Sequence, residues 1–333
     1  MMGMPGLNER ADIETPAAIA TTAPPRGTRV LPLVLFALFA AVPIAAAFGP
    51  KTYVLALATR IMILSIAAMS LDLLIGYGAM ISFGHAAFIG IGAYSVAILA
   101  SHGIHDCLVQ LAVALAVSGL FALITGAISL RTKGVHFIMI TLAFGQMLFF
   151  LTTSLAAYGG DDGLTLESRS LVFGSALLKN DTVQYFAVLG IMAGTYLLLR
   201  AIVASRFGRV LRGISENPVR MQAIGFAPYR YQLAAYIIAG MIAGVAGSLL
   251  ANQAEFVSPA YSTWQRSGDL IFIVVLGGLG TLHGAIIGAA IFSLLAELLS
   301  GFTEHWGMIF GPILILVVLF ARGGIAGLVG RAP

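Results

Sequence analysis

Charged residues are scarce in this chain, and their scarcity decides its class. Asp, Glu, Lys and Arg make up 10% of its 333 residues, whereas soluble globular domains carry about 25%. Hydrophobic residues make up 59%, and the mean hydropathy is +0.98. This composition excludes a soluble globular domain and predicts an integral membrane protein.

The sequence also lacks the common devices of catalysis and cofactor binding. Its single cysteine, Cys107, excludes an internal disulfide. No glycine-rich loop precedes a Lys-Ser or Lys-Thr pair, and no two histidines are spaced to share a helix face with a carboxylate. We therefore expect no metal site, no bound cofactor and no enzyme activity, because no acid and base are paired. If ATP and Mg²⁺ drive this protein, another subunit must bind them.

Long runs of alternating polar and apolar residues are absent, which argues against a membrane β-barrel. Apolar blocks recur instead, each close to the roughly 20 residues that cross a bilayer as a helix. The predicted fold class is an all-α polytopic membrane protein, a helical bundle with interrupted or re-entrant segments and a possible internal repeat. The expected helices cover residues 31–48, 53–75, 85–100, 108–130, 135–155, 182–204, 231–252 and 307–320.

The positions of Lys and Arg indicate which side of the membrane each loop occupies. Most of the 18 fall in segments that would all lie on one side, and cytoplasmic loops are the ones enriched in these residues. The net charge of +4 follows from this topology, so nucleic-acid binding is not expected. The predicted domains are a cytoplasmic N-terminal tail at 1–30, a transmembrane domain at 31–321 with a cytoplasmic loop at 205–230, and a cytoplasmic tail at 322–333.

The first apolar block, at 31–48, is expected to stay in the mature protein as a helix. A cleaved signal peptide is the competing interpretation, because Ala45, Ala46 and Ala47 resemble a processing site. The long polar tail ahead of the block favours the retained helix.

Two apolar stretches, at 76–84 and 277–281, are interrupted by glycines without any charge. Each contains a hydroxyl side chain and is followed closely by a histidine, His85 or His283. Matched interruptions in the two halves of a membrane protein indicate a substrate path between structural repeats, although such glycines also allow close helix packing. We favour the path. Its candidate residues are Asp72, Gly76, Gly78, Ser82, Gly84, His85, Gly277, Gly278, Gly280 and Thr281.

Asp72 and the end of the chain each allow two interpretations. An acid inside a membrane segment is costly and marks a functional candidate. Asp72 is therefore either an ion-coupling group or an acceptor for water or for backbone amides in the joint at 76–84. After residue 268 we favour a re-entrant pair broken at 277–281 and then one full span; the alternative is three short spans. Arg60 is expected to extend toward the membrane surface.

One long polar stretch, at 206–230, lies between apolar blocks. It carries five arginines and one acid, Glu216, together with apolar residues at near-helical spacing. The sequence SENP at 215–218 is typical of a helix start and Gly225 of a helix end, so residues 219–224 are predicted to form a short surface helix. Such a helix, with apolar residues and a basic rim, suits a partner's groove. The alternative is binding to anionic lipid.

Five stretches carry a family resemblance. They are SLDLLIGYGAMISFGHAAFIGIGAY at 70–94, FIMITLAFGQM at 137–147, GGDDGL at 159–164, GRVLRGISENPVRMQAIGF at 208–226 and VVLGGLGTLHGAIIGAA at 274–290. With these motifs in this order, the chain resembles the LivM-like permease subunits of ABC importers for branched-chain amino acids. Members of that family often carry Asn and Gln where this chain has Asp72 and Met80.

The resemblance implies a function and partners. The chain is expected to form half of a translocation pathway for branched-chain amino acids or related small polar solutes in a bacterial inner membrane. The expected partners are a second, LivH-like permease, two cytoplasmic ABC ATPases, a periplasmic substrate-binding protein and the lipid bilayer. The alternative function is an ion-coupled secondary transporter that uses Asp72. The residues expected to couple to the ATPases are Arg209, Arg212, Glu216, Asn217, Ala223 and Gly225.

Overall fold

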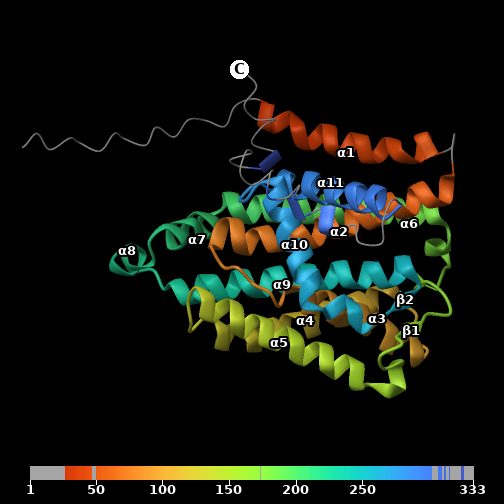
Figure 1. Cartoon of the computed structure of the whole chain (residues 1–333), viewed down its shortest axis with the longest axis horizontal. Helices are drawn as coiled ribbons and strands as arrows, with labels where there is room; N and C mark the ends of the chain where they lie inside the picture. Colours follow the sequence, from red (N-terminus) through yellow and green to blue (C-terminus); the bar gives the residue numbers. More distant parts are fainter. Residues whose placement is uncertain are drawn as a thin grey trace, which may run out of the picture.

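The computed structural model describes residues 27–46, 50–172, 174–301, 307–309, 311–312, 315 and 324–325. Over these ranges the chain is almost entirely α-helical, with one small antiparallel sheet (Figure 1). The predicted all-α polytopic membrane fold is confirmed. Six described helices are long and apolar enough to cross a membrane: α2 (Lys51–Gly78), α4 (Cys107–Ser129), α5 (Val135–Ser154), α6 (Asp181–Ala204), α9 (Pro228–Ala254) and α11 (Leu282–Ser300).

The remaining elements are shorter or less apolar. The α-helices are α1 (Gly27–Ala46), α3 (His85–Ser101), α7 (Arg206–Glu216), α8 (Pro218–Ala223) and α10 (Trp264–Gly277). The 3₁₀ turns are η1 (Ala156–Tyr158), η2 (Leu177–Lys179) and η3 (Pro259–Ser262), and the paired strands are β1 (Leu164–Thr165) and β2 (Phe256–Val257).

α2 and α9 form the centre of the bundle and pack against each other. α2 also contacts α1, α6, α10 and α11, while α9 contacts α3 and α4. In Figure 1, α1 lies along one edge and α5 along the opposite edge. α7 and α8 project from one end, which we call the basic end; β1 and β2 lie at the other, which we call the loop end (Figure 1).

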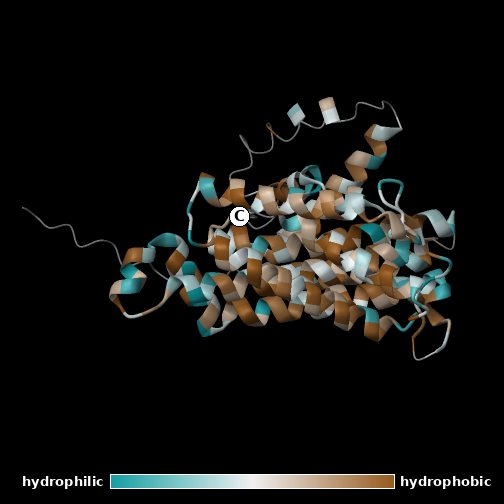
Figure 2. Ribbon diagram, turned by 90° about the horizontal axis from the view of Figure 1, so that it is seen from below, coloured by the Kyte–Doolittle hydropathy of each residue, from teal (hydrophilic) through white to brown (hydrophobic). Residues whose placement is uncertain are grey.

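Hydropathy separates the body of the bundle from its two ends (Figure 2). Hydrophobic residues dominate along the helices, and hydrophilic residues gather at the basic end and the loop end. Several apolar side chains on the outer helices, among them Leu120, Phe150 and Leu197, are more than half exposed. An apolar belt between two polar ends is what a bilayer requires of a spanning body. The chain is a multi-pass membrane protein.

Predicted and observed helix ends differ by at most three residues for the six apolar blocks between residues 53 and 252. The first block differs more, because α1 begins at Gly27 instead of residue 31. The predicted start of this helix is therefore wrong by a helical turn, since the helix extends through polar residues ahead of the apolar run. The rest of the predicted N-terminal tail, residues 1–26, lies outside the described ranges.

Three stretches outside the predicted spanning helices contain regular structure. The stretch at 206–230 holds α7, α8 and the first residues of α9. The segment between α9 and α10 is only 255–263, because α9 continues until Glu255 adopts a left-handed backbone (φ 51°) and α10 starts at Trp264. The loop at 156–181 is held to the end of α9 by the pairing of β1 with β2.

α10 and α11 pack as a hairpin, which both the re-entrant pair and the three short spans would contain, so the number of crossings after residue 268 stays a prediction. α10 starts at the loop end, and its turn at 278–281 reaches Gly76 near the last turn of α2. α11 then returns to the loop end, where Glu297 accepts a hydrogen bond of 2.5 Å from the Tyr53 hydroxyl. Gly324 lies against Gly278 at the turn. The predicted final span at 307–320 and the tail at 322–333 lie largely outside the described residues.

Candidate functional site

The two interrupted segments meet at Asp72. This residue of α2 is fully buried, and its Oδ1 accepts a hydrogen bond of 2.8 Å from the backbone N–H of Gly280. Asp72 Oδ2 forms no hydrogen bond with any described residue. Asp72 therefore does accept from a backbone amide, but the amide belongs to the second interruption and not, as the sequence suggested, to the first.

Gly76, one turn further along α2, lies against the turn between α10 and α11. A side chain at position 76 would overlap the backbone of Gly280, so only glycine allows this approach. α2 stays helical through Gly76 and ends at Gly78, and the next residue, Ala79, has a left-handed φ of 52°. The predicted joint at 76–84 therefore begins three residues too early, because glycine keeps its helical hydrogen bonds where no water competes for them.

The start of α3 is fixed by two other helices. His85 Nε2 lies 2.8 Å from Ser70 Oγ on α2. The backbone N–H of Ala86 donates to Ser267 Oγ on α10 at 3.0 Å. His85 and Ser82 are both fully buried. These predicted pathway residues are thus packed against neighbouring helices in this conformation.

Several glycines of the two breaks face backbone atoms. A Cβ at Gly84 would overlap a carbonyl of α5, and one at Gly277 would overlap a carbonyl of α11. Gly278 and Gly280 have φ values of 116° and 72°, which glycine adopts readily, and Thr281 Oγ1 donates to the carbonyl of Gly278 at 2.6 Å. Close packing, the alternative interpretation of these glycines, is confirmed. Their part in a substrate path stays a prediction.

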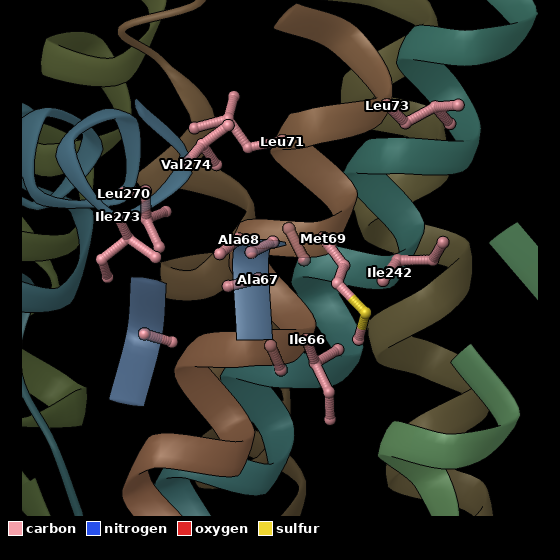
Figure 3. Close-up of a cluster of buried hydrophobic side chains, with 14 of the residues drawn as sticks. Ile66, Ala67, Ala68, Met69, Leu71, Leu73, Ile242, Leu270, Ile273 and Val274 are labelled. Carbon is pink, nitrogen blue, oxygen red and sulfur yellow. The ribbon is translucent and has the colours of Figure 1, made fainter. Parts of the chain in front are cut away.

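An apolar layer separates the Asp72 contact from the loop end. Leu270, Ile273 and Val274 of α10 belong to the same buried cluster as Ala68 and Leu71 of α2 (Figure 3). None of the five is more than 2% exposed. A solute moving between α2 and α10 would have to separate these side chains.

At the basic end, α8 has the caps that its sequence predicts. Asn217 Oδ1 accepts a hydrogen bond of 2.9 Å from the N–H of Arg220, and Pro218 occupies the first helical turn. The N–H groups of Gly225 and Phe226 donate back into the last turn, and Gly225 has a φ of 91°. The predicted short surface helix is confirmed.

α7 connects α8 to the centre of the bundle. Val210 and Ile214 of α7 are buried against Met221 of α8. The guanidinium of Arg212 lies 4.9 Å from the centre of the Tyr77 ring, in the last turn of α2. α8 is therefore connected, through α7, to the part of α2 that contacts Gly280.

The other predicted coupling residues lie at the surface of the basic end. Arg209 donates to the carbonyl of Ala204 at 3.1 Å and so closes the end of α6. Glu216 and Ala223 are exposed, and Glu216 takes part in none of the ion pairs within the described part of the chain. All six predicted residues are thus gathered on α7, on α8 and in their caps.

Exposed apolar side chains surround α8 at the same end. Val219 is 70% exposed and Ile224 63%, and Phe226 is also exposed. At the end of the bundle that carries the most arginine, an uncovered apolar face of this kind marks a surface for another protein or for lipid.

A set of charged side chains at the loop end was not predicted from the sequence as a site. Arg60 of α2, Arg266 and Asp269 of α10, and Glu297 of α11 line one cavity of about 540 Å³. Arg60, expected only to extend toward the membrane surface, faces this cavity. The signal was available, because Arg60, Asp269 and Glu297 each lie within an otherwise apolar segment. Within the described residues, no cluster of His, Cys, Asp or Glu is suited to hold a metal ion.

The family known as the branched-chain amino acid transport system permease component matches residues 53–319. The chain belongs to this family. The permease is 27% identical to LivM, a high-affinity branched-chain amino acid transport system permease protein of Escherichia coli, over 81% of this chain and 69% of that protein. It is 25% identical to LivM of Salmonella typhimurium, with the same shares covered.

The permease is also similar to a second type of relative. It is 35% identical to a probable branched-chain amino acid transport permease protein, LivH, of Methanocaldococcus jannaschii, over 44% of this chain and 47% of that protein. No solved structure matches the permease. The predicted family is confirmed, and the comparisons give no support to an ion-coupled secondary transporter.

Proposed function

We propose that the permease forms half of the translocation pathway of an ATP-driven importer for branched-chain amino acids or related small polar solutes. Family membership supports the class of protein. The observation that carries the mechanism is the series of contacts from α8 through α7 to Tyr77, in the last turn of α2 just before the first break. A surface helix that is connected in this way to the two breaks suits a subunit whose conformation is changed by a protein bound at the membrane surface.

Each end of the bundle faces one side of the membrane and has its own partner proteins. The relatives named LivM and LivH are permease proteins of branched-chain amino acid transport systems, which supports a LivH-like permease as the other half of the pathway. Two ABC ATPases at the basic end bind ATP and Mg²⁺, so the permease itself needs no cofactor. A substrate-binding protein delivers solute at the loop end. The basic end and the N-terminus then face the cytoplasm, and the loop end faces the periplasm across a bacterial inner membrane.

In this mechanism the ATPases move α8 when they close around ATP. α7 passes the movement to the Arg212–Tyr77 contact at the end of α2. The hydrogen bond between Asp72 and Gly280 joins α2 to the α10–α11 turn, so the turn moves with α2 or the contact breaks. The apolar layer between α2 and α10 closes the pathway in this conformation, and either outcome alters the packing of this layer.

The docking role is tested with charges placed on the exposed apolar face of α8. Val219→Asp and Ile224→Asp should each abolish binding of the ATPases and ATP-driven uptake in proteoliposomes, because a carboxylate would be buried in the interface. Ile104→Asp is the matched control, since Ile104 is an exposed apolar residue at the opposite end. Normal ATPase binding by both α8 variants would reject the docking role.

A second test separates this proposal from ion coupling. Proteoliposomes that contain all the subunits, ATP on the α8 side and no ion gradient should accumulate the solute. Uptake that requires an ion gradient and proceeds without the ATPases would instead favour the alternative function.

A further inference from the structure

The loop-end cavity has the size of a small-molecule site. Its volume is about 540 Å³, and it lies between α2, α3, α9, α10, α11 and η3. Pockets that hold small ligands in proteins usually measure about 300–1,000 Å³. Neither the proposed function nor the family comparison assigns a ligand to it.

The lining of the cavity changes with depth. α2 and α10 both run inward from the loop end, so Leu64 lies deeper than Arg60, and Ile273 deeper than Arg266. α11 runs outward, which places Phe292 deeper than Glu297. The cavity therefore has a charged mouth and an apolar floor.

Two guanidiniums at the mouth are available to a ligand. Arg60 takes part in none of the ion pairs within the described ranges. Arg266 Nη1 is 3.7 Å from Asp269 Oδ2, a contact between partly exposed side chains that is too long for a hydrogen bond. Burial raises the pKa of Tyr261 in η3, while Arg266 and Arg60 oppose that rise. Both arginines therefore lie within electrostatic reach of one tyrosine hydroxyl.

Two carboxylates balance these arginines. Asp269 lies one turn after Arg266 on α10, and Glu297 of α11 uses Oε1 to accept the Tyr53 hydrogen bond. The four charged side chains have no net charge. A ligand with one charge of either sign would meet two unfavourable groups, whereas a zwitterion can pair with both kinds. Arginine binds a carboxylate through two parallel hydrogen bonds, and a carboxylate accepts from an ammonium group.

We propose that this cavity binds a free α-amino acid with an apolar side chain. Arg60 and Arg266 hold its carboxylate, Asp269 and Glu297 hold its ammonium group, and the side chain enters the floor formed by Leu64, Ile273 and Phe292. This site rests on the proposed importer function and deepens it, because the permease itself then recognises the solute after the binding protein releases it.

A phosphatidylethanolamine headgroup has the same two charges, so the experiment must distinguish it from a free amino acid. The permease is purified as the full chain with its partner permease and placed in nanodiscs of phosphatidylcholine alone. In a Cys107→Ser background, Ser293→Cys introduces a thiol into the wall of the cavity, next to Phe292. The rate at which a small thiosulfonate reagent labels this thiol reports occupancy even when binding is weak.

L-leucine is expected to slow this labelling at least fivefold. Glycine lacks the apolar side chain, 4-methylpentanoate lacks the ammonium group and isoamylamine lacks the carboxylate; each should slow it less than twofold. Adding Arg60→Gln should remove the protection by leucine. Ser175→Cys, in an exposed loop outside the cavity, is the control thiol whose labelling no ligand should change.

Labelling that leucine leaves unchanged, or protection that persists with Arg60→Gln, would overturn the proposed site. If added phosphatidylethanolamine protects the thiol and leucine does not, the cavity binds lipid, and the proposed amino-acid site is also overturned. Uptake by the complete transporter distinguishes failure of the proposed site from failure of the proposed importer function. If ATP drives leucine uptake while leucine gives no protection, the site fails and the importer function stands; if no uptake occurs under any condition, the importer function fails.

Discussion

Asp72 and Gly280 lie 208 residues apart in the sequence, yet a hydrogen bond of 2.8 Å joins them inside the bundle. It is one of the contacts that hold the turn between α10 and α11 against α2. Asp72 Oδ2 has no hydrogen-bond partner among the described residues, so loss of the Gly280 contact would leave this buried side chain without either bond. The contact therefore supplies the one hydrogen bond that this buried carboxylate forms within the described residues, which makes it a suitable element for a conformational switch.

The first prediction separates the hydrogen bond of Asp72 from its charge. Asp72→Asn keeps an oxygen that accepts from Gly280, whereas Asp72→Ala removes it. Asp72→Asn should retain most ATP-driven uptake, and Asp72→Ala should lose at least tenfold, with a free energy of unfolding lower by about 1–3 kcal/mol. Uptake and thermal unfolding in nanodiscs measure the two effects. If Asp72→Asn abolishes uptake while the protein stays folded, the charge itself is needed and ion coupling gains support.

The second prediction concerns the close approach at Gly76. In Gly76→Ala the new methyl group would overlap the backbone of Gly280 and the carboxylate of Asp72. The helices must separate to accept it, so we expect a loss of stability of more than about 1 kcal/mol and a loss of uptake. Gly194→Ala in α6 is the matched control, because no atom outside the helix lies near that position in the described part of the chain. If Gly76→Ala and Gly194→Ala have the same free energy of unfolding and the same uptake rate, Gly76 does not approach Gly280 as closely as described.

Much of the fold could be predicted because apolar blocks in a membrane protein have few other uses. The ends of α4, α5 and α6 coincide almost fully with the limits of their apolar runs. The first break was misplaced because Gly76 and Gly78 were interpreted as helix breakers, as they would be in water. Inside the bundle they remain helical, and the break starts at Ala79.

The site was harder to predict than the fold. The sequence marked Asp72 and the glycines at 277–281 separately, but no local pattern shows that α10 places Gly280 beside Asp72. The loop-end cavity is similar, since its charges come from α2, α10 and α11. α8 was predicted well, because Asn217, Pro218 and Gly225 act locally as helix caps.

The third prediction tests transmission from α7 to α2. Arg212→Gln and Tyr77→Leu each remove the contact between the guanidinium and the ring, which contributes about 0.5–2 kcal/mol. Both variants should still bind the ATPases, because neither residue belongs to the exposed face of α8. The ratio of solute transported to ATP hydrolysed should fall severalfold. Tyr77→Phe keeps the ring and should behave like the wild type. If the ratio of solute transported to ATP hydrolysed in Tyr77→Phe is as low as in Tyr77→Leu, the hydroxyl and not the ring is responsible.

The last prediction concerns the cap of α8. Asn217→Ala removes the side chain that accepts from the N–H of Arg220, and loss of such a cap costs about 0.5–2 kcal/mol of helix stability. Because α8 has only six residues, this cost should unfold it part of the time and weaken ATPase binding severalfold. Asn217→Asp keeps the acceptor and should restore binding. Hydrogen exchange of the α8 amides provides the independent measurement: it should quicken in Asn217→Ala, return to the original rate in Asn217→Asp, and stay unchanged in α4 of both. Weakened binding without faster exchange would mean that Asn217 contacts the ATPase directly.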